Sequence, residues 1–200
     1  PETTADNHGS TGICAVAIGD TTALPAAWRT SAFIGNVVTN VVHRDPIAWR
    51  GSSPWVEKPE EFLACDDWWF RPVDLAFGPD GGLYVADFYN CIIGHYEVDL
   101  HHPRRDRERG RIWRVVAAGK GSSSPPDLDP LPVSELVDRL GGPTGTLRRL
   151  AFETLLTRAG SDAAVGRALD DAARTTPHEA GEMIAAGPTK ADAAAHRRAL

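Results

Sequence analysis

The first 117 residues hold several short apolar segments whose pattern predicts strands. Ile13–Ile18 and Phe33–Val42 are rich in β-branched residues and predict strands. Val73–Asp87 alternates on both sides of the turn Pro79–Gly82, which predicts a β-hairpin. Arg111–Val116 predicts a third strand after a long loop. This part of the chain is therefore expected to be mainly β.

The apolar spacing changes to three and four residues after position 132, as in Val133, Leu136, Val137 and Leu140. This spacing predicts short amphipathic helices over 133–140, 147–158 and 162–174, and the capping residues from Thr176 predict the start of another helix. Each helix has one apolar stripe, so we expect antiparallel helix pairs that stack on one another.

The composition changes near residue 120: all six Trp and all three Tyr precede it. Residues 118–132 are rich in Pro and Ser and predict an extended linker. The sequence thus predicts a β domain over 1–117, a linker over 118–132 and an α-helical segment over 133–200.

Charge is unevenly distributed within the net −6: residues 101–120 hold seven Lys/Arg against two Asp/Glu. Such a basic loop either holds an anionic ligand or pairs with itself, because RRDRERGR alternates in sign. One short basic stretch is too small a footprint for nucleic-acid binding. No apolar run reaches the length of a transmembrane helix. His101 and His102 have no third ligand nearby, so no metal site is predicted.

The hairpin geometry predicts one functional face. The segment that enters its first strand, 66–72, and the loop that leaves its second, 88–110, lie at the same end of the sheet. Loops of that length are uncommon unless they are functional or disordered. Its aromatic, imidazole and guanidinium groups suit a planar or anionic small molecule. The candidate cofactor-binding residues are Arg71, Tyr89, Asn90, His95, Arg104 and Arg105. The alternative is structural: Trp68, Trp69 and Phe70 belong to the core, and Arg71 pairs with Asp66 or Asp87.

Several motifs resemble a known family: WFRP, GPDGGLYVAD, NCIIGH and RDRERGRIWR occur in that order. Residues 7–117 are similar to the end of the membrane-bound dehydrogenase-like β-propeller domain of planctomycete and verrucomicrobial proteins, which is related to the glucose/sorbosone dehydrogenases. The resemblance implies partial β-propeller blades followed by HEAT-like helical repeats over 133–200.

The resemblance also implies a function. The parent protein would be a periplasmic or extracellular sugar or alcohol dehydrogenase that uses pyrroloquinoline quinone (PQQ) and calcium in the complete propeller. It would pass electrons to a c-type cytochrome domain and associate with the membrane through other parts of the protein. The chain has three cysteines and no CxxCH motif, so haem c is expected only in a domain outside it.

This chain is expected to be an inactive piece of that parent. It holds about two blades, whereas a closed propeller needs about four or more. The family's catalytic His and most quinone ligands lie in earlier blades, so no catalytic residue is assigned here. Two alternatives stay open: a non-catalytic module that binds glycans or a protein partner, and a structural role in which the Arg-rich loop latches the last blade to the helical segment.

Overall fold

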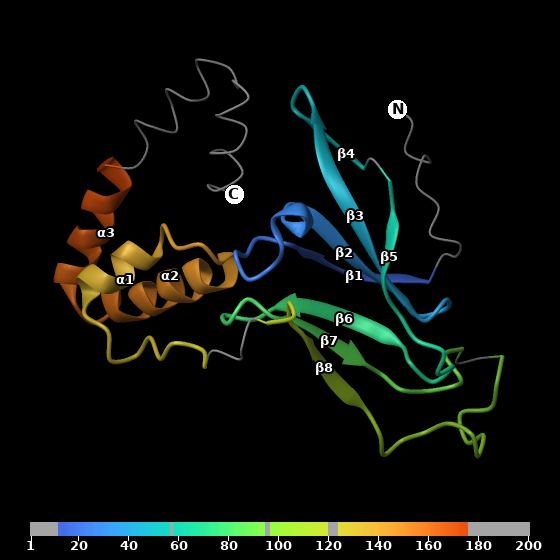
Figure 1. Ribbon diagram of the computed structural model, residues 1–200. Helices are drawn as coiled ribbons and strands as arrows, with labels where there is room; N and C mark the ends of the chain where they lie inside the picture. Colours follow the sequence, from blue (N-terminus) through green and yellow to red (C-terminus); the bar gives the residue numbers. More distant parts are fainter. Residues whose placement is uncertain (1–11, 57, 95–96, 120–123, 176–200) are drawn as a thin grey trace. The chain divides into compact units, whose positions relative to one another are not determined.

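The computed structural model describes residues 12–56, 58–94, 97–119 and 124–175 (Figure 1). The chain divides into two compact units. The first consists of residues 1–19, 23–77 and 82–121, and the second consists of residues 20–22, 78–81 and 122–200.

The first unit begins with a five-stranded antiparallel sheet. Its strands are β1 (Ile13–Ile18), β2 (Ser31–Asn36), β3 (Val41–Arg50), β4 (Ser53–Val56) and β5 (Glu60–Ala64). They are ordered β1-β2-β3-β4, and β5 also pairs with β3. A 3-10 turn, η1 (Ala26–Trp28), lies between β1 and β2. The prediction of β1 is confirmed at both ends.

The run that sequence analysis treated as one strand, Phe33–Val42, is in fact a hairpin, and that prediction was wrong. The side chain of Asn36 accepts hydrogen bonds from the backbone N–H groups of Val38 and Thr39, which closes a turn between β2 and β3. Asn40 completes this turn in the left-handed region, at φ 61°. The β-branched residues on both sides hid the turn.

A second antiparallel sheet contains the predicted hairpin and third strand. It consists of β6 (Pro72–Phe77), β7 (Leu83–Asp87) and β8 (Arg111–Val115), in that order. Gly81, at φ 78°, donates its N–H to the carbonyl of Gly78 and closes the tight turn. Both sheets are open, since neither closes into a barrel within the described residues.

The two sheets of this unit share one core (Figure 1). It consists of Ala17, Leu24, Phe33, Val42, Phe70, Leu75, Leu83 and Val85. Strand β6 approaches the first sheet so closely that Gly35 has no room for a side chain: an added Cβ would lie 2.4 Å from the carbonyl oxygen of Pro72. The Cys14 thiol lies 3.4 Å from the same oxygen and donates a hydrogen bond to it. Glycine at position 35 therefore sets the sheet separation.

Three of the predicted helices lie in the described part of the second unit: α1 (Val133–Arg139), α2 (Gly145–Ala159) and α3 (Ala163–Thr175). Asp162 accepts the N–H of Ala164 at 2.8 Å and caps α3. The helix expected from Thr176 lies outside the described residues. None of the described helices combines the length and apolar character needed to cross a membrane.

The end of the predicted linker is packed rather than free. Leu128 is buried in the helical core with Leu136, Ala151, Leu155 and Val165. Arg158 of α2 donates hydrogen bonds to the carbonyls of Leu128, Asp129 and Leu131. The second unit therefore includes this stretch. The assignment of the helices to HEAT-like repeats stays a prediction, as do the predicted domain limits.

We predict that Gly35→Ala destabilises the first unit by about 1–3 kcal/mol, because the new methyl group meets main-chain oxygens that cannot move without shifting a sheet. Urea denaturation followed by tryptophan fluorescence measures the change, since every Trp lies in this part of the chain. Gly110→Ala is the matched control, because its Cβ would make ordinary contact at 3.6 Å. Equal stability of the two variants would contradict the account.

Candidate functional site

A buried guanidinium group, that of Arg71, organises the face predicted from the sequence. Only 6% of this residue is exposed. Its Nε donates to the carbonyl of Asn90 at 2.8 Å, and its Nη1 donates to the carbonyl of Val37 at 2.6 Å and to Oδ1 of Asn40 at 2.8 Å. Burial lowers the pKa of Arg71 from its usual value. Arg71 lies just before β6, and its side chain therefore connects this segment with both the β2–β3 turn and loop 88–110.

Asp87, at the end of β7, collects donors from three directions. Its Oδ1 accepts the backbone N–H groups of Arg71 at 2.8 Å and Tyr89 at 2.9 Å. Its Oδ2 accepts Nε1–H of Trp113 at 3.0 Å and lies 4.0 Å from Nη1 of Arg111. The carboxylate is buried, so these donors replace water around it. Asp87 therefore fixes how segment 66–72, loop 88–110 and β8 meet.

Loop 88–110 is ordered by its own polar groups. Asn90 donates its side-chain amide to the carbonyl of Asp106 at 2.8 Å. Arg105 donates to the carbonyls of Gly94, Val98 and Asp99, and Arg107 donates to that of Leu100. These guanidinium groups satisfy main-chain acceptors that no sheet or helix pairs. In this loop the arginines build the backbone conformation.

Aromatic rings and guanidinium groups stack at this end of the unit. The rings of Trp69 and Tyr89 lie 5.4 Å apart between centroids. The guanidinium of Arg111 lies 3.2 Å from the Tyr89 centroid, and that of Arg109 lies 5.4 Å from the Trp69 centroid and 5.8 Å from the Tyr89 centroid. We call Trp69, Tyr89, Arg109 and Arg111 the stacked cluster.

Tyr89 holds its place in the stacked cluster at a cost in backbone strain. Its φ is 49°, in the left-handed region that aromatic residues rarely adopt. The Asp87 carboxylate holds the Tyr89 N–H in this conformation, and Asp67 accepts the Tyr89 hydroxyl at 3.1 Å. Strained residues of this kind concentrate at functional sites. This strain marks the stacked cluster as the best candidate site in the first unit.

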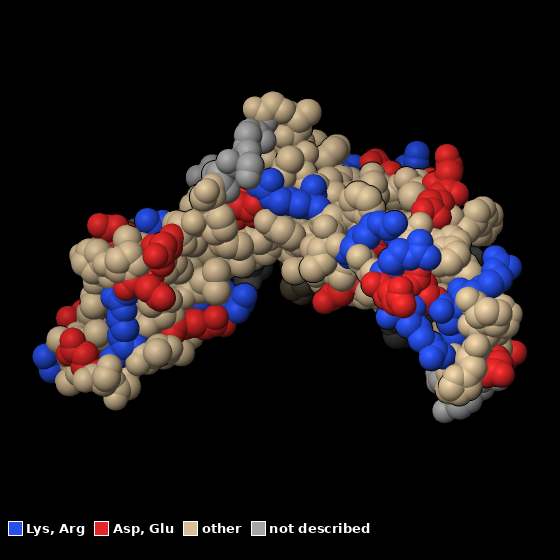
Figure 2. All heavy atoms as spheres, turned by 90° about the horizontal axis from the view of Figure 1, so that it is seen from below, with Lys and Arg blue, Asp and Glu red and all other residues tan. Residues whose placement is uncertain are grey.

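The stacked cluster is compensated in charge. Arg109 forms an ion pair with Asp106, Arg111 lies beside Asp87, and Asp67 adds a third carboxylate. On the face shown in Figure 2, basic and acidic side chains intermingle over the surface and form no large patch of one sign. The buried carboxylates of Asp87 and Asp106 already offset the charge of the two guanidinium groups, and an anionic ligand would also meet the exposed carboxylate of Asp67. The arrangement suits a neutral ligand with hydroxyl groups better.

The structure brings together most of the sequence-predicted site residues. Arg71, Asn90 and Arg105 lie in or against loop 88–110, with the side-chain partners given above. Tyr89 lies in the stacked cluster, and Arg104 is exposed on the loop. His95 lies outside the described residues. Cofactor binding by these residues stays a prediction. The structural reading is right for Phe70, which is buried, and wrong for Trp68, which is 76% exposed.

Arg109 and Arg111 were not among the predicted site residues, and Asp87 was expected only as a partner of Arg71. One signal in the sequence points to Arg111. Pairing the predicted strand Arg111–Val116 with the second strand of the hairpin, without a bulge, puts Arg111 opposite Asp87, as the structure shows. No pattern in the sequence indicates that Tyr89 adopts a left-handed conformation, because the interaction responsible is made by a carboxylate two residues away.

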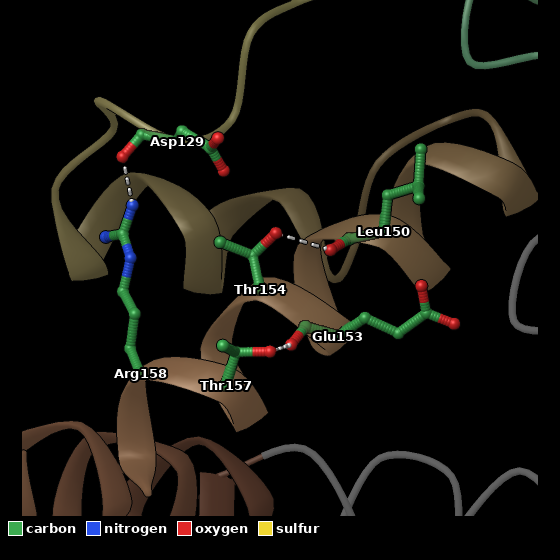
Figure 3. Close-up of a pocket in the computed structure, with 6 residues that line it drawn as sticks. All are labelled: Asp129, Leu150, Glu153, Thr154, Thr157 and Arg158. Atoms are coloured by element: carbon green, nitrogen blue, oxygen red, sulfur yellow. Dashed lines mark hydrogen bonds between the residues drawn. The ribbon is translucent and has the colours of Figure 1, made fainter. Parts of the chain in front are cut away.

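Other polar groups of the described residues serve the fold. In the second unit, a cavity of about 240 Å³ is lined by Asp129, Leu150, Glu153, Thr154, Thr157 and Arg158 (Figure 3). The Thr154 and Thr157 hydroxyls donate to carbonyls one turn earlier in α2, and Arg158 donates to the carbonyl of Asp129. The cavity's two hydroxyl groups are therefore engaged within α2. In the part of the chain that the structure describes, no three His, Cys, Asp or Glu side chains gather to hold a metal ion.

The first unit, with two open antiparallel sheets and a charge-compensated aromatic cluster at one end, matches a family model over residues 2–119. The family is described as "Domain of unknown function (DUF7133)". The chain belongs to this family, since the match covers more than half of it.

Two solved structures are similar to part of the chain. A crystal structure of glucose dehydrogenase is 27% identical, with a TM-score of 0.37, over 55% of this chain and 24% of that one. A second glucose dehydrogenase is 25% identical, with a TM-score of 0.35, over 54% and 26%. The chain spans about a quarter of the length of these proteins. No curated protein matches it.

We predict that Arg71→Met loosens loop 88–110 and destabilises the first unit by about 3 kcal/mol, because buried carbonyls lose a charged donor. Limited proteolysis with subtilisin reports loop opening, and urea denaturation reports stability. Arg104→Met removes an exposed arginine from the same loop and is the control. If the loops of the two variants are cleaved at the same rate, Arg71 does not hold this loop.

The turn at Asp106 gives a second prediction, for acid pH. The backbone N–H of Glu108, together with the N–H and guanidinium of Arg109, lowers the pKa of Asp106 from its usual 3.8. The folded carboxylate binds fewer protons than the unfolded one, so this stabilisation is complete above pH 3.8 and is lost as pH falls through the lowered pKa.

Backbone amide shifts of Glu108 and Arg109, followed by NMR, should therefore show an acid transition with a midpoint below 3.8. Asp106→Asn should abolish this transition, while Glu97→Gln, at an exposed position of the same loop, should leave it in place. A midpoint at or above 3.8 in the unmodified protein would show that these donors do not stabilise the carboxylate.

Proposed function

We propose that this chain forms the last blades of a dehydrogenase-type β-propeller in a sugar or alcohol dehydrogenase, and that the stacked cluster contacts the substrate. The observation that supports this proposal most is the stacked cluster of aromatic rings and charge-compensated guanidinium groups, which lies where segment 66–72 meets loop 88–110. The ordered motifs that resemble the dehydrogenase-like propellers support the reaction class, and the two open antiparallel sheets support the blades.

The chemistry of the stacked cluster fits a neutral polyhydroxylated substrate. Aromatic faces pack against the C–H faces of a sugar ring. The exposed Asp67 carboxylate can accept hydrogen bonds from hydroxyls, and the exposed Arg109 guanidinium can donate them. Trp69 is half-buried, so part of its ring is available at the surface. The neighbouring Trp68, 76% exposed, adds a second aromatic surface in the same segment.

The described residues fit a polycarboxylate cofactor less well. PQQ carries several carboxylates and would need guanidinium groups with free donors. Arg71 and Arg105 donate to main-chain carbonyls, and Arg109 and Arg111 lie beside carboxylates. Calcium binds best where several carboxylates converge, and no three acidic side chains of the described residues gather in this way. We therefore propose that PQQ and calcium both bind elsewhere in the complete propeller.

The rest of the proposed reaction also lies with the complete protein. Electrons would pass to a c-type cytochrome domain, the protein would be periplasmic or extracellular, and HEAT-like repeats would follow the propeller. These proposals are supported by the sequence resemblance alone.

A second candidate function is a module that binds glycans without turnover. One observation favours it: the polar groups of this face are engaged in holding the loop, as the contacts of Asp87 and Arg105 show. A face built in this way presents rigid aromatic surfaces, and its engaged polar groups are not placed to transfer a proton. Both functions use the stacked cluster, and turnover distinguishes them.

The test uses the complete protein in which this chain occurs, with PQQ and calcium added. Dye-linked oxidation of neutral sugars and alcohols measures turnover, and tryptophan fluorescence titration with glucose and gluconate measures binding. We predict turnover with neutral sugars, and that Trp69→Leu raises KM about tenfold with little change in kcat, because the lost contact is worth about 1.4 kcal/mol in binding.

Trp49→Leu is the matched control, since Trp49 is a half-exposed tryptophan on β3 outside the stacked cluster. Sugar binding without turnover, weakened by Trp69→Leu, would replace the dehydrogenase with the glycan-binding module. Tighter binding of gluconate than of glucose would contradict the neutral-ligand assignment. Absence of both binding and turnover in the folded protein would overturn both functions.

A further inference from the structure

The Tyr89 hydroxyl and the Asp67 carboxylate form a hydrogen bond at the surface of the first unit. Tyr89 donates its O–H to Oδ2 of Asp67 at 3.1 Å, and this hydrogen bond is exposed. The tyrosine oxygen keeps its lone pairs after donating its proton, and an ionised carboxylate oxygen accepts more than one hydrogen bond. Two acceptors therefore lie side by side at the surface, and we call these two oxygens the acceptor pair.

Asp67 holds its oxygen of the acceptor pair in a fixed position. Its other oxygen, Oδ1, accepts the backbone N–H of Trp69 at 3.0 Å. Its main-chain carbonyl accepts the N–H of Phe70 at 2.9 Å and the side-chain amide of Asn40 at 3.1 Å. Asn40 in turn accepts a hydrogen bond from the buried guanidinium of Arg71. The orientation of the carboxylate is thus built into the fold, so a ligand would bind Oδ2 without first ordering this side chain.

Tyr89 holds the second oxygen just as firmly. Its ring lies against Trp69 and Arg111, and its backbone N–H binds the buried Asp87 carboxylate. Its φ of 49° costs free energy, whereas a hydrogen bond open to water adds little net stability. The hydrogen bond to Asp67 therefore does not offset the strain, which indicates a role in binding a ligand rather than in stability.

Two adjacent acceptors match two adjacent hydroxyl donors. Hydroxyl groups on neighbouring carbons lie side by side when they are gauche, whereas anti hydroxyls point to opposite sides of the C–C bond. A cation could also donate to the pair, but the Tyr89 ring already carries the guanidinium of Arg111, so a further cation gains little from this ring. The half-buried ring of Trp69 offers an apolar surface for the C–H groups of a sugar. The acceptor pair therefore fits a neutral vicinal diol.

We propose that Asp67 and Tyr89 bind a gauche vicinal diol of the substrate, with one hydroxyl donating to each oxygen of the acceptor pair. The proposal rests on the proposed function and narrows it. Among sugars and alcohols, the site selects pyranoses with neighbouring equatorial hydroxyls over alcohols with a single hydroxyl. No proton is transferred in this contact, so it serves a dehydrogenase and a glycan-binding module equally.

The first test compares two glucose derivatives with the same configuration at C2, C3 and C4. Methyl α-glucoside holds these hydroxyls equatorial and gauche, whereas the anhydro bridge of levoglucosan forces them axial and anti. Tryptophan fluorescence titration of the complete protein, with PQQ and calcium, should show about tenfold or more tighter binding of methyl α-glucoside, since levoglucosan loses one hydrogen bond to the pair. Equal affinities, or tighter binding of methylguanidine than of methyl α-glucoside, would overturn the proposal.

The second test assigns this discrimination to the acceptor pair. Tyr89→Phe removes one acceptor but keeps the ring, so it should weaken methyl α-glucoside binding about tenfold and leave levoglucosan binding unchanged. Asp67→Asn should act in the same way, because Oδ1 stays bound to the Trp69 N–H and an amide NH₂ replaces the other oxygen. The matched controls are Tyr84→Phe, at a half-buried tyrosine of β7, and Asp66→Asn, at the exposed neighbour of Asp67. If folded Tyr89→Phe keeps the full discrimination, the diol binds elsewhere and the proposal fails.

These outcomes separate the acceptor pair from the proposed function. Sugar turnover with equal binding of the two derivatives would contradict the acceptor pair alone. Discrimination that is lost in Tyr89→Phe, in a protein without turnover, would support the acceptor pair in a glycan-binding module. Absence of both binding and turnover with every sugar, in the folded protein, would overturn both.

Discussion

The first unit depends on a single buried guanidinium group with main-chain acceptors. Arg71 donates to carbonyls in the β2–β3 turn and in loop 88–110, while its own backbone N–H binds Asp87 at the end of β7. A buried charge is tolerated when its donors are satisfied, and here carbonyl dipoles take the place of water. The two sheets, the long loop and the entry to β6 are thereby held at one point. The stacked cluster can form only because this point is fixed.

The strain at Tyr89 follows from the same arrangement. The backbone must turn sharply after β7 for loop 88–110 to reach Arg71, and the Asp87 carboxylate pays for the left-handed turn with a hydrogen bond to the Tyr89 N–H. The turn places the tyrosine ring against Trp69 and Arg111. The backbone strain at Tyr89, the anchoring of the loop and the aromatic surface therefore all depend on the same turn after β7.

The sequence predicts the parts of the fold that rest on periodicity. The β6–β7 hairpin, β8 and the three helices follow from apolar spacing and turn residues, and they lie close to where they were expected. The β2–β3 turn was missed because a side-chain cap by Asn36 replaces the usual glycine or proline signal. Hairpin geometry also predicts that segment 66–72 meets loop 88–110, and their hydrogen bonds show that it does. The hydrogen-bond partners of the arginines in this region could not be predicted, because they are main-chain carbonyls, which every residue type carries.

In loop 88–110 the backbone conformation depends on arginine–carbonyl hydrogen bonds and therefore little on which side chains the other residues carry. Arg105 and Arg107 bind acceptors that every residue type provides, so the residues that contribute only a carbonyl can change without altering the frame. Outward positions in the described part of this loop can therefore change while the arginines keep the same backbone frame, so its surface and its architecture can vary independently.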